Sequence, residues 1–337
     1  MPLRTARATA ATMTAAATTA VTFIATVIAA LTVAAPHAGA ASAEPVIRYA
    51  GLAGNCLRSD GTRRPCGPWK LWLSDGRVVA LPDARRIAKT ETGYPAAAPL
   101  SISPHGARVA YFREDDGALM IWEAATGRAR RVPGVGWPGD LRLVEITLST
   151  RARFVGVYGL RGSRWVDRVV DTVTGRSFTL PDGRRSLRFS PDLKHMLADG
   201  QSVTEIYSTA TWSVERRWVK QRRTDHLYGD LAPDGVTVAT ALRTETRGSA
   251  GNTVTLHNLA TGERSTLSLR LRSGETVHRA RWDGAGRLDV LTFSTRHVAN
   301  RFRTTYTWYR LDRATHGLRR LDSFTATSAL WDHRPAF

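Results

Sequence analysis

The chain of 337 residues contains little cysteine and little lysine. Its only cysteines are Cys56 and Cys66, and two cysteines without neighbouring histidine or cysteine ligands do not make a zinc site. No cysteine follows the N-terminal apolar segment, which argues against a lipoprotein. Four lysines stand among 48 basic residues, so almost all of the positive charge is arginine. Codon usage in a G+C-rich genome would explain why arginine is more frequent than lysine. It would not explain why basic residues outnumber acidic residues.

The sequence also lacks the motifs that mark common active sites. It has no G-x-S-x-G of hydrolases, no H-E-x-x-H of zinc proteases and no phosphate-binding P-loop. Its histidines are scattered, and none stands at a metal-ligand spacing from another. We therefore expect no catalytic residue, no metal and no cofactor, and we predict that the protein is not an enzyme.

Residues 1–43 have the layout of a secretory signal peptide. Arg4 and Arg7 precede an apolar run over about residues 15–35, and small-x-small sites follow it. We predict that the segment is removed and that residues 44–337 are secreted as one extracellular domain. In the alternative, an apolar run of about 20 residues stays uncleaved and anchors the protein in a membrane.

Cys56 and Cys66 enclose a short loop, NCLRSDGTRRPCGP. An exported chain meets an oxidising compartment, so this spacing favours a disulfide. Closing so small a loop would stabilise the fold by about 2.7 kcal/mol. We predict that the two cysteines are bonded.

A four-strand pattern repeats at intervals of roughly 40–50 residues. The best copy, from Leu100 to Pro133, has strands over Arg108–Phe112 and Ala118–Glu123, with a Pro-His-Gly turn before them and a Thr-Gly turn after them. Other copies begin at Leu187, Gly229 and Arg279, the last with a long loop between its middle strands. Each copy corresponds to one blade of a β-propeller.

The two ends of the chain complement each other. Ser328–Asp332 resembles an inner strand with no blade after it, and Val46–Leu81 supplies three strands with no inner strand before them. Joining them removes an open sheet edge. The predicted fold is all-β, a six-bladed β-propeller of four-stranded blades, closed by a C-terminal strand that joins the N-terminal blade. Seven shorter blades are the alternative.

The turns S-P-x-G, A-P-D-G and W-D-G, each followed by an apolar strand and later by a T-G hairpin, resemble the repeats of TolB-like and WD-repeat propellers. The resemblance covers about residues 44–337. Trp282-Asp283 and Trp331-Asp332 end inner strands, which is closer to the TolB-like type of the bacterial envelope. This resemblance implies binding of proteins or other ligands more often than catalysis.

Arginine recurs in the connections that a propeller places on one face, between second and third strands and between successive blades. Neighbouring positive charges add their fields, although salt screens them beyond ~10 Å. We predict that these residues form a basic rim that binds a partner or an anion. The candidate rim consists of Arg63, Arg64, Arg161, Arg164, Arg222, Arg223, His226, Arg243, Arg247, Arg301 and Arg303.

Two further groups of residues are candidates for contact with a ligand. Trp137, in a loop beside glycine and proline, has no strand to pack in, and an exposed ring there would stack on a ligand. Tryptophans on the outer hairpins, in contrast, are expected to pack between blades. The inner strands carry polar residues that would line the central channel or, in the alternative, pair with each other, namely Glu145, Arg188, Asp230 and Arg281.

These features predict a secreted, non-catalytic binding or scaffold propeller of the bacterial cell envelope. Its basic loop face would bind a protein or an anionic envelope polymer, and no specific nucleic-acid motif is present. The alternative is a propeller hydrolase or lyase with an active site at the channel mouth. Its candidate residues are Asp140, Asp225, His226 and Asp230.

Overall fold

The computed structural model describes residues 44–337 with several gaps. The gaps are residues 55, 58, 60–62, 65, 89–95, 138–139, 162–163, 182–183, 221–228, 242–251, 299–300, 328–332 and 336–337. The predicted signal peptide, residues 1–43, lies outside the described residues. Within the described part, no helix is long and apolar enough to cross a membrane.

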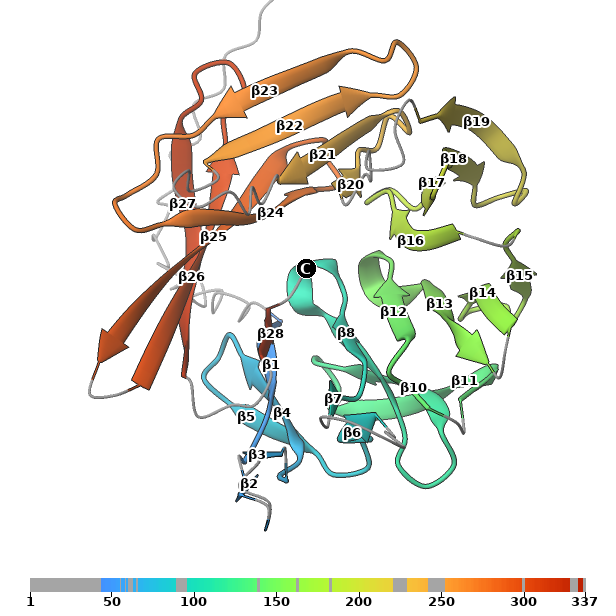
Figure 1. Ribbon diagram of the computed structural model, residues 1–337, viewed down its shortest axis with the longest axis vertical. Helices are drawn as coiled ribbons and strands as arrows, with labels where there is room; N and C mark the ends of the chain where they lie inside the picture. The colour runs from blue at the N-terminus through green and yellow to red at the C-terminus, as the bar shows by residue number, and fades with distance from the viewer. Residues whose placement is uncertain are drawn as a thin grey trace, which may run out of the picture. The chain divides into compact units, whose positions relative to one another are not determined.

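Six four-stranded antiparallel sheets surround a common centre, and small hairpins lie outside them (Figure 1). From the centre outward, the first two blades are β28 (His333–Pro335), β1 (Ile47–Leu52), β4 (Trp69–Leu73) and β5 (Val78–Leu81), then β8 (Leu100–Ile102), β9 (Arg108–Phe112), β10 (Ala118–Glu123) and β11 (Arg128–Gly136). The next two are β12 (Val144–Leu148), β13 (Phe154–Arg161), β14 (Arg164–Asp171) and β15 (Ser177–Thr179), then β16 (Arg184–Phe189), β17 (His195–Gly200), β18 (Val203–Ser208) and β19 (Val214–Val219). The last two are β20 (Gly229–Leu231), β21 (Thr237–Ala241), β22 (Thr253–Asn258) and β23 (Arg264–Ser268), then β24 (Thr276–Trp282), β25 (Leu288–Val298), β26 (Arg301–Leu311) and β27 (Leu318–Thr327).

The small hairpins are β2 (Cys56–Leu57) with β3 (Arg63–Arg64), and β6 (Ile87–Ala88) with β7 (Ala96–Ala97). The predicted six-bladed β-propeller is therefore confirmed, with six blades rather than seven.

The strand that completes the first blade comes from the far end of the chain. β28 pairs antiparallel with β1, and Pro335 stands opposite Tyr49. The predicted closure of the N-terminal blade by a C-terminal strand is thus confirmed, although the predicted segment itself, residues 328–332, lies outside the described residues. The Tyr49 ring also stacks on Trp72 of β4 at 4.6 Å and on Phe324 of β27 at 5.3 Å, so blade 6 contacts blade 1.

In the described residues the hydrophobic core forms six clusters, one between each pair of neighbouring blades. Leu71 of blade 1 and Leu100 of blade 2 share one cluster, and Trp308 of blade 6 and Tyr49 of blade 1 share another. Burying a large apolar side chain contributes about 1.5–3 kcal/mol. The buried apolar side chains therefore pack mainly between neighbouring blades. The tryptophans of the outer hairpins were expected to pack there.

Local turn chemistry explains where the strands begin and end. The strands predicted over Arg108–Phe112 and Ala118–Glu123 are β9 and β10. Before β9 the chain turns through Gly106, whose φ of +75° favours glycine. β10 is buried along most of its length because neighbouring blades cover both of its faces, whereas the outermost strand β19 is mostly exposed.

Blade 6 differs from the sequence-based prediction of a long loop between its middle strands. β25 and β26 stay paired from Leu288, opposite Leu311, to Val298, opposite Arg301. Threonine recurs along both strands, and its β-branched side chain favours extended pairing. The hairpin extends to the lower left in Figure 1, and Arg301 and Arg303 therefore lie on a strand and not in a loop.

Cys56 and Cys66 form the predicted disulfide, and their Cα atoms lie 5.8 Å apart. The bond closes the segment that contains the β2–β3 hairpin, between β1 and β4. It therefore constrains the connection that carries Arg63 and Arg64.

Because both sulfur atoms are bonded, a thiol reagent should label neither cysteine of the unfolded, unreduced protein and both after reduction. Mass spectrometry of the labelled chain counts the modified residues. Labelling of Cys56 and Cys66 without reductant would contradict the bond.

Candidate functional site

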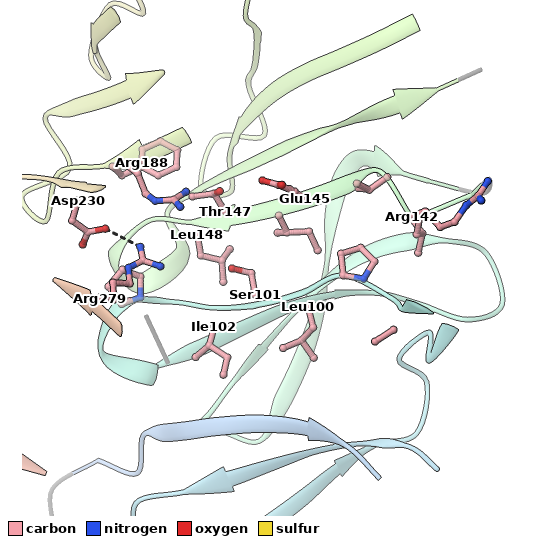
Figure 2. A pocket seen from close by; sticks show the side chains of 17 residues that line it. Leu100, Ser101, Ile102, Arg142, Glu145, Thr147, Leu148, Arg188, Asp230 and Arg279 are labelled. Atoms are coloured by element: carbon pink, nitrogen blue, oxygen red, sulfur yellow. Dashed lines mark hydrogen bonds and ion pairs between the residues drawn. The ribbon is translucent and has the colours of Figure 1, made fainter. Parts of the chain in front are cut away.

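A cavity of about 390 Å³ lies among the inner strands at the centre of the ring. The strands β8, β12, β16, β20 and β24 all contribute lining residues. Leu100, Ile102 and Leu148 give the cavity apolar walls, and Ser101 and Thr147 add hydroxyl groups (Figure 2). Its volume and mixed lining suit a small ligand with both apolar and polar parts.

The charged residues of the cavity come from four different blades. Arg279 donates from Nη2 to Oδ1 of Asp230 at 2.8 Å, while Arg188 and Glu145 point toward one another (Figure 2). Arg188 also donates from Nη1 to the carbonyl oxygen of Leu187 at 2.7 Å. Its Nε is buried and has no hydrogen-bond partner among the described residues. The cavity thus contains one arginine–carboxylate pair and one incompletely satisfied guanidinium.

The surroundings of Arg188 indicate which kind of ligand group the cavity would bind. Burial and then repulsion from Arg279 lower the pKa of Arg188 to about 10, although Asp230 and Glu145 act in the opposite direction. The guanidinium still carries its charge at pH 7. A buried donor without a hydrogen-bond partner costs free energy. An oxygen acceptor of a ligand that accepts a hydrogen bond from Nε of Arg188 would therefore stabilise this guanidinium group.

Three of the four polar residues that the sequence places in the channel line this cavity, namely Glu145, Arg188 and Asp230. Arg281 is not among the lining residues. Its Cζ atom lies 3.7 Å from the centre of the Trp308 ring, and burial lowers its pKa to about 10. Its guanidinium group therefore packs on an aromatic ring and does not line the central cavity.

Arg279 also lines the cavity, although it was not among the residues predicted for the channel. The ladder between β24 and β25 shifts register between Val277 and Arg279. From Arg279 to Trp282 the ladder is regular, so Arg279 and Arg281 lie on the same side of the strand. The assignment of Arg281 to the channel was therefore the signal that could have found Arg279.

The structure describes two of the four residues of the alternative active site, Asp140 and Asp230. Each accepts a hydrogen bond from an arginine. Oδ2 of Asp140 accepts a hydrogen bond from Nε of Arg142 at 2.6 Å, and Asp230 is paired in the cavity. Asp225 and His226 lie outside the described residues. In the part of the chain that the structure describes, no group of three or more His, Cys, Asp or Glu residues is placed to hold a metal ion.

The described members of the candidate rim all lie on hairpins that connect second and third strands. Arg63 and Arg64 form β3, and Arg161 stands directly opposite Arg164 at the end of the β13–β14 hairpin. On the β25–β26 hairpin, the exposed Arg303 stands opposite Arg296, and Arg301 begins β26. Five members lie outside the described residues: Arg222, Arg223, His226, Arg243 and Arg247. That the whole set forms one rim stays a prediction.

Trp137 is buried, with 5% of its surface exposed, so the expectation of an exposed stacking ring was wrong. β11 continues to Gly136, and the Trp137 amide donates to the carbonyl oxygen of Gly117 at 2.7 Å, which extends the pairing beyond the strand. The indole nitrogen donates to the carbonyl oxygen of Asp140 at 3.1 Å. The ring therefore packs in the core between blades 2 and 3.

No family model and no curated protein sequence matches this chain. Solved structures with a similar fold include TolB from Acinetobacter baumannii, which is 15% identical, with a TM-score of 0.48 over 86% of this chain and 65% of that chain. A putative TolB from Agrobacterium tumefaciens is 11% identical, with a TM-score of 0.44 over 70% of this chain and 85% of that chain. Dipeptidyl peptidase 4 from Porphyromonas gingivalis is 12% identical, with a TM-score of 0.37 over 68% of this chain and 40% of that chain. Similarity at these levels concerns the fold alone. The six four-stranded blades, closed by a C-terminal strand, show that the chain has a six-bladed β-propeller fold.

Proposed function

We propose that the protein is a secreted, non-catalytic binding propeller of the bacterial cell envelope that holds an anionic partner on its basic loop face. The partner is an acidic protein or an anionic polymer of the envelope. The signal-like residues 1–43 and the Cys56–Cys66 disulfide support an extracellular location, where oxidising conditions keep such bonds intact.

The observation that carries this proposal is that arginines stand directly opposite one another on two hairpins. Arg161 is opposite Arg164, and Arg296 is opposite Arg303. Directly opposed residues of an antiparallel pair have Cβ atoms about 4.5–5.5 Å apart, so the like charges of Arg296 and Arg303 repel and destabilise their hairpin. Binding of an anion between these two arginines would offset that repulsion, which supports a binding role for the basic loop face.

Replacing Arg161 and Arg164 by glutamate should weaken binding of a polyanion, because two attractive charges become repulsive. We expect at least a tenfold increase in Kd for polyphosphate, measured by surface plasmon resonance at low salt. Binding to the unchanged protein should weaken as salt is added, since counterions screen the attraction.

The matched control is the double replacement of Arg128 and Arg176 by glutamate. These exposed arginines follow the Thr-Gly turns at Gly127 and Gly175, which the blade geometry places on the opposite face. The net charge changes by the same amount in both variants. Equal losses of binding in the two variants would mean diffuse attraction to the whole protein and would overturn the proposed face.

A further inference from the structure

A groove of about 350 Å³ on blade 6 lies apart from the central cavity. Its lining comes from β25, β26, β27 and the connection that precedes β24. The groove combines arginines with hydroxyl groups, chiefly Arg272, Arg296, Arg320, Ser294, Thr305 and Ser323. It has the polarity of a binding site for a hydrophilic anion.

The three arginines are exposed, and none forms an ion pair with a described carboxylate. The carboxylate of Glu275, the acidic residue of the lining, accepts hydrogen bonds from the Tyr309 hydroxyl at 3.1 and 3.3 Å. Three positive charges against one negative charge leave the lining with two net positive charges. These guanidinium groups are therefore available to an added anion.

Arg272 and Arg320 reach the same part of the groove from different segments. Burial and the charge of Glu275 raise the pKa of Tyr309, and the charges of Arg272 and Arg320 oppose this increase. Both guanidinium groups therefore lie close enough to act on one hydroxyl in the lining of the groove. An anion bound beside Tyr309 would lie near both arginines.

A ladder of hydroxyl groups runs beside the arginines. Oγ1 of Thr305 lies 3.1 Å from Oγ1 of Thr325, and Oγ1 of Thr307 lies 3.2 Å from Oγ of Ser323. Strand alternation turns the intervening Tyr306 to the opposite face, into the core against blade 1. Hydroxyl groups both donate and accept hydrogen bonds, so this row suits a ligand that is itself hydroxylated.

We propose that this groove binds the phosphate group of a phosphorylated polyol or sugar. Arginine binds phosphate oxygens through two parallel hydrogen bonds, and a phosphate monoester carries about −1.5 to −2 charges at pH 7, which matches the lining. The hydroxyl ladder then binds the carrier. The inference rests on the proposed function, because it names the anionic group that one hairpin of the basic face recognises.

The test compares Arg320→Gln with Arg319→Gln in the full chain. Both residues are exposed on β27, but Arg320 stands opposite Tyr309 and Arg319 opposite Arg310, so they lie on different faces of the sheet. We expect glycerol phosphate, titrated by calorimetry at low salt, to bind Arg320→Gln at least tenfold more weakly and Arg319→Gln within about twofold of the unchanged chain. Inorganic phosphate should bind the unchanged chain more weakly than glycerol phosphate, and acetate more weakly still.

Equal effects of the two substitutions, or acetate binding as tightly as glycerol phosphate, would overturn the groove as a phosphate site. Both variants should keep the thermal midpoint of the unchanged chain, which excludes loss of folding as the cause. If the groove fails while the Arg161 and Arg164 variant still loses polyphosphate binding, the proposed function stands without this site. If glycerol phosphate binds through Arg320 but the Arg161 and Arg164 variant binds polyphosphate normally, the proposed loop face fails instead.

Discussion

Replacing Lys220 by alanine should lower the free energy of unfolding by about 3–5 kcal/mol, because it removes one partner of a buried ion pair. The side chains of Lys220 and Asp199 are almost wholly buried, and Nζ of Lys220 lies 2.7 Å from Oδ1 of Asp199. Nζ also donates to the carbonyl oxygen of Gly200 at 2.6 Å. Denaturant unfolding followed by fluorescence measures the loss.

Lys194→Ala is the matched control, since it removes the same charge from the same blade. Lys194 is largely exposed, and its Nζ lies 3.8 Å from Asp192, so solvent screens the pair and the change should stay within about 0.5 kcal/mol. Replacing Lys220 by methionine together with Asp199 by leucine should recover much of the loss, because apolar side chains of similar volume then replace both members of the buried pair. Similar small effects of Lys194→Ala and Lys220→Ala would show that the buried pair does not hold blade 4 together.

Gly106→Ala should destabilise the protein by several kcal/mol because a Cβ atom at this position has no room. It would overlap the carbonyl oxygen of Ile47 in β1 and lie 2.9 Å from the Ile47 nitrogen. Overpacking of this kind costs about 1–3 kcal/mol, in addition to about 1–2 kcal/mol for placing alanine at positive φ. The thermal midpoint and the denaturant midpoint should both fall.

Gly127→Ala separates the two contributions. Gly127 has a φ of +67°, close to that of Gly106, but a Cβ atom there would meet nothing within 4 Å. We expect this control to lose only the conformational part, about 1–2 kcal/mol. A loss at Gly127 as large as that at Gly106 would mean that the contact between the blade 2 turn and β1 contributes little.

The blade architecture is predictable from the sequence because its determinants are local. Each turn encodes its own geometry: Gly106 and Gly127 adopt the positive φ that glycine tolerates, and the strands between these two turns are rich in apolar residues. Ring closure was predictable for a different reason. One inner strand lacked a blade and three strands lacked an inner strand, so pairing them removed an open edge.

The candidate site was less predictable because it depends on register and on distant contacts. Glu145, Arg188 and Asp230 were assigned to the channel because predicted inner strands carry them, but the partner of Asp230 is Arg279, which comes from the inner strand of another blade. Trp137 has loop-like neighbours in sequence, yet its backbone continues the pairing of blade 2 and buries the ring. Neither the pairing of side chains from different blades nor the reach of a strand beyond its regular end follows from residue type alone.

The pairing of β28 with β1 also determines the order in which the domain matures. Ribosomes make β1 early and β28 last among the described strands, so the first blade stays one strand short while five others are synthesised. During that interval the backbone edge of β1 and the apolar surface between blades 6 and 1 stay open to wrong partners. A chain interrupted before His333–Pro335 would remain in this vulnerable state, whatever the quality of its other blades.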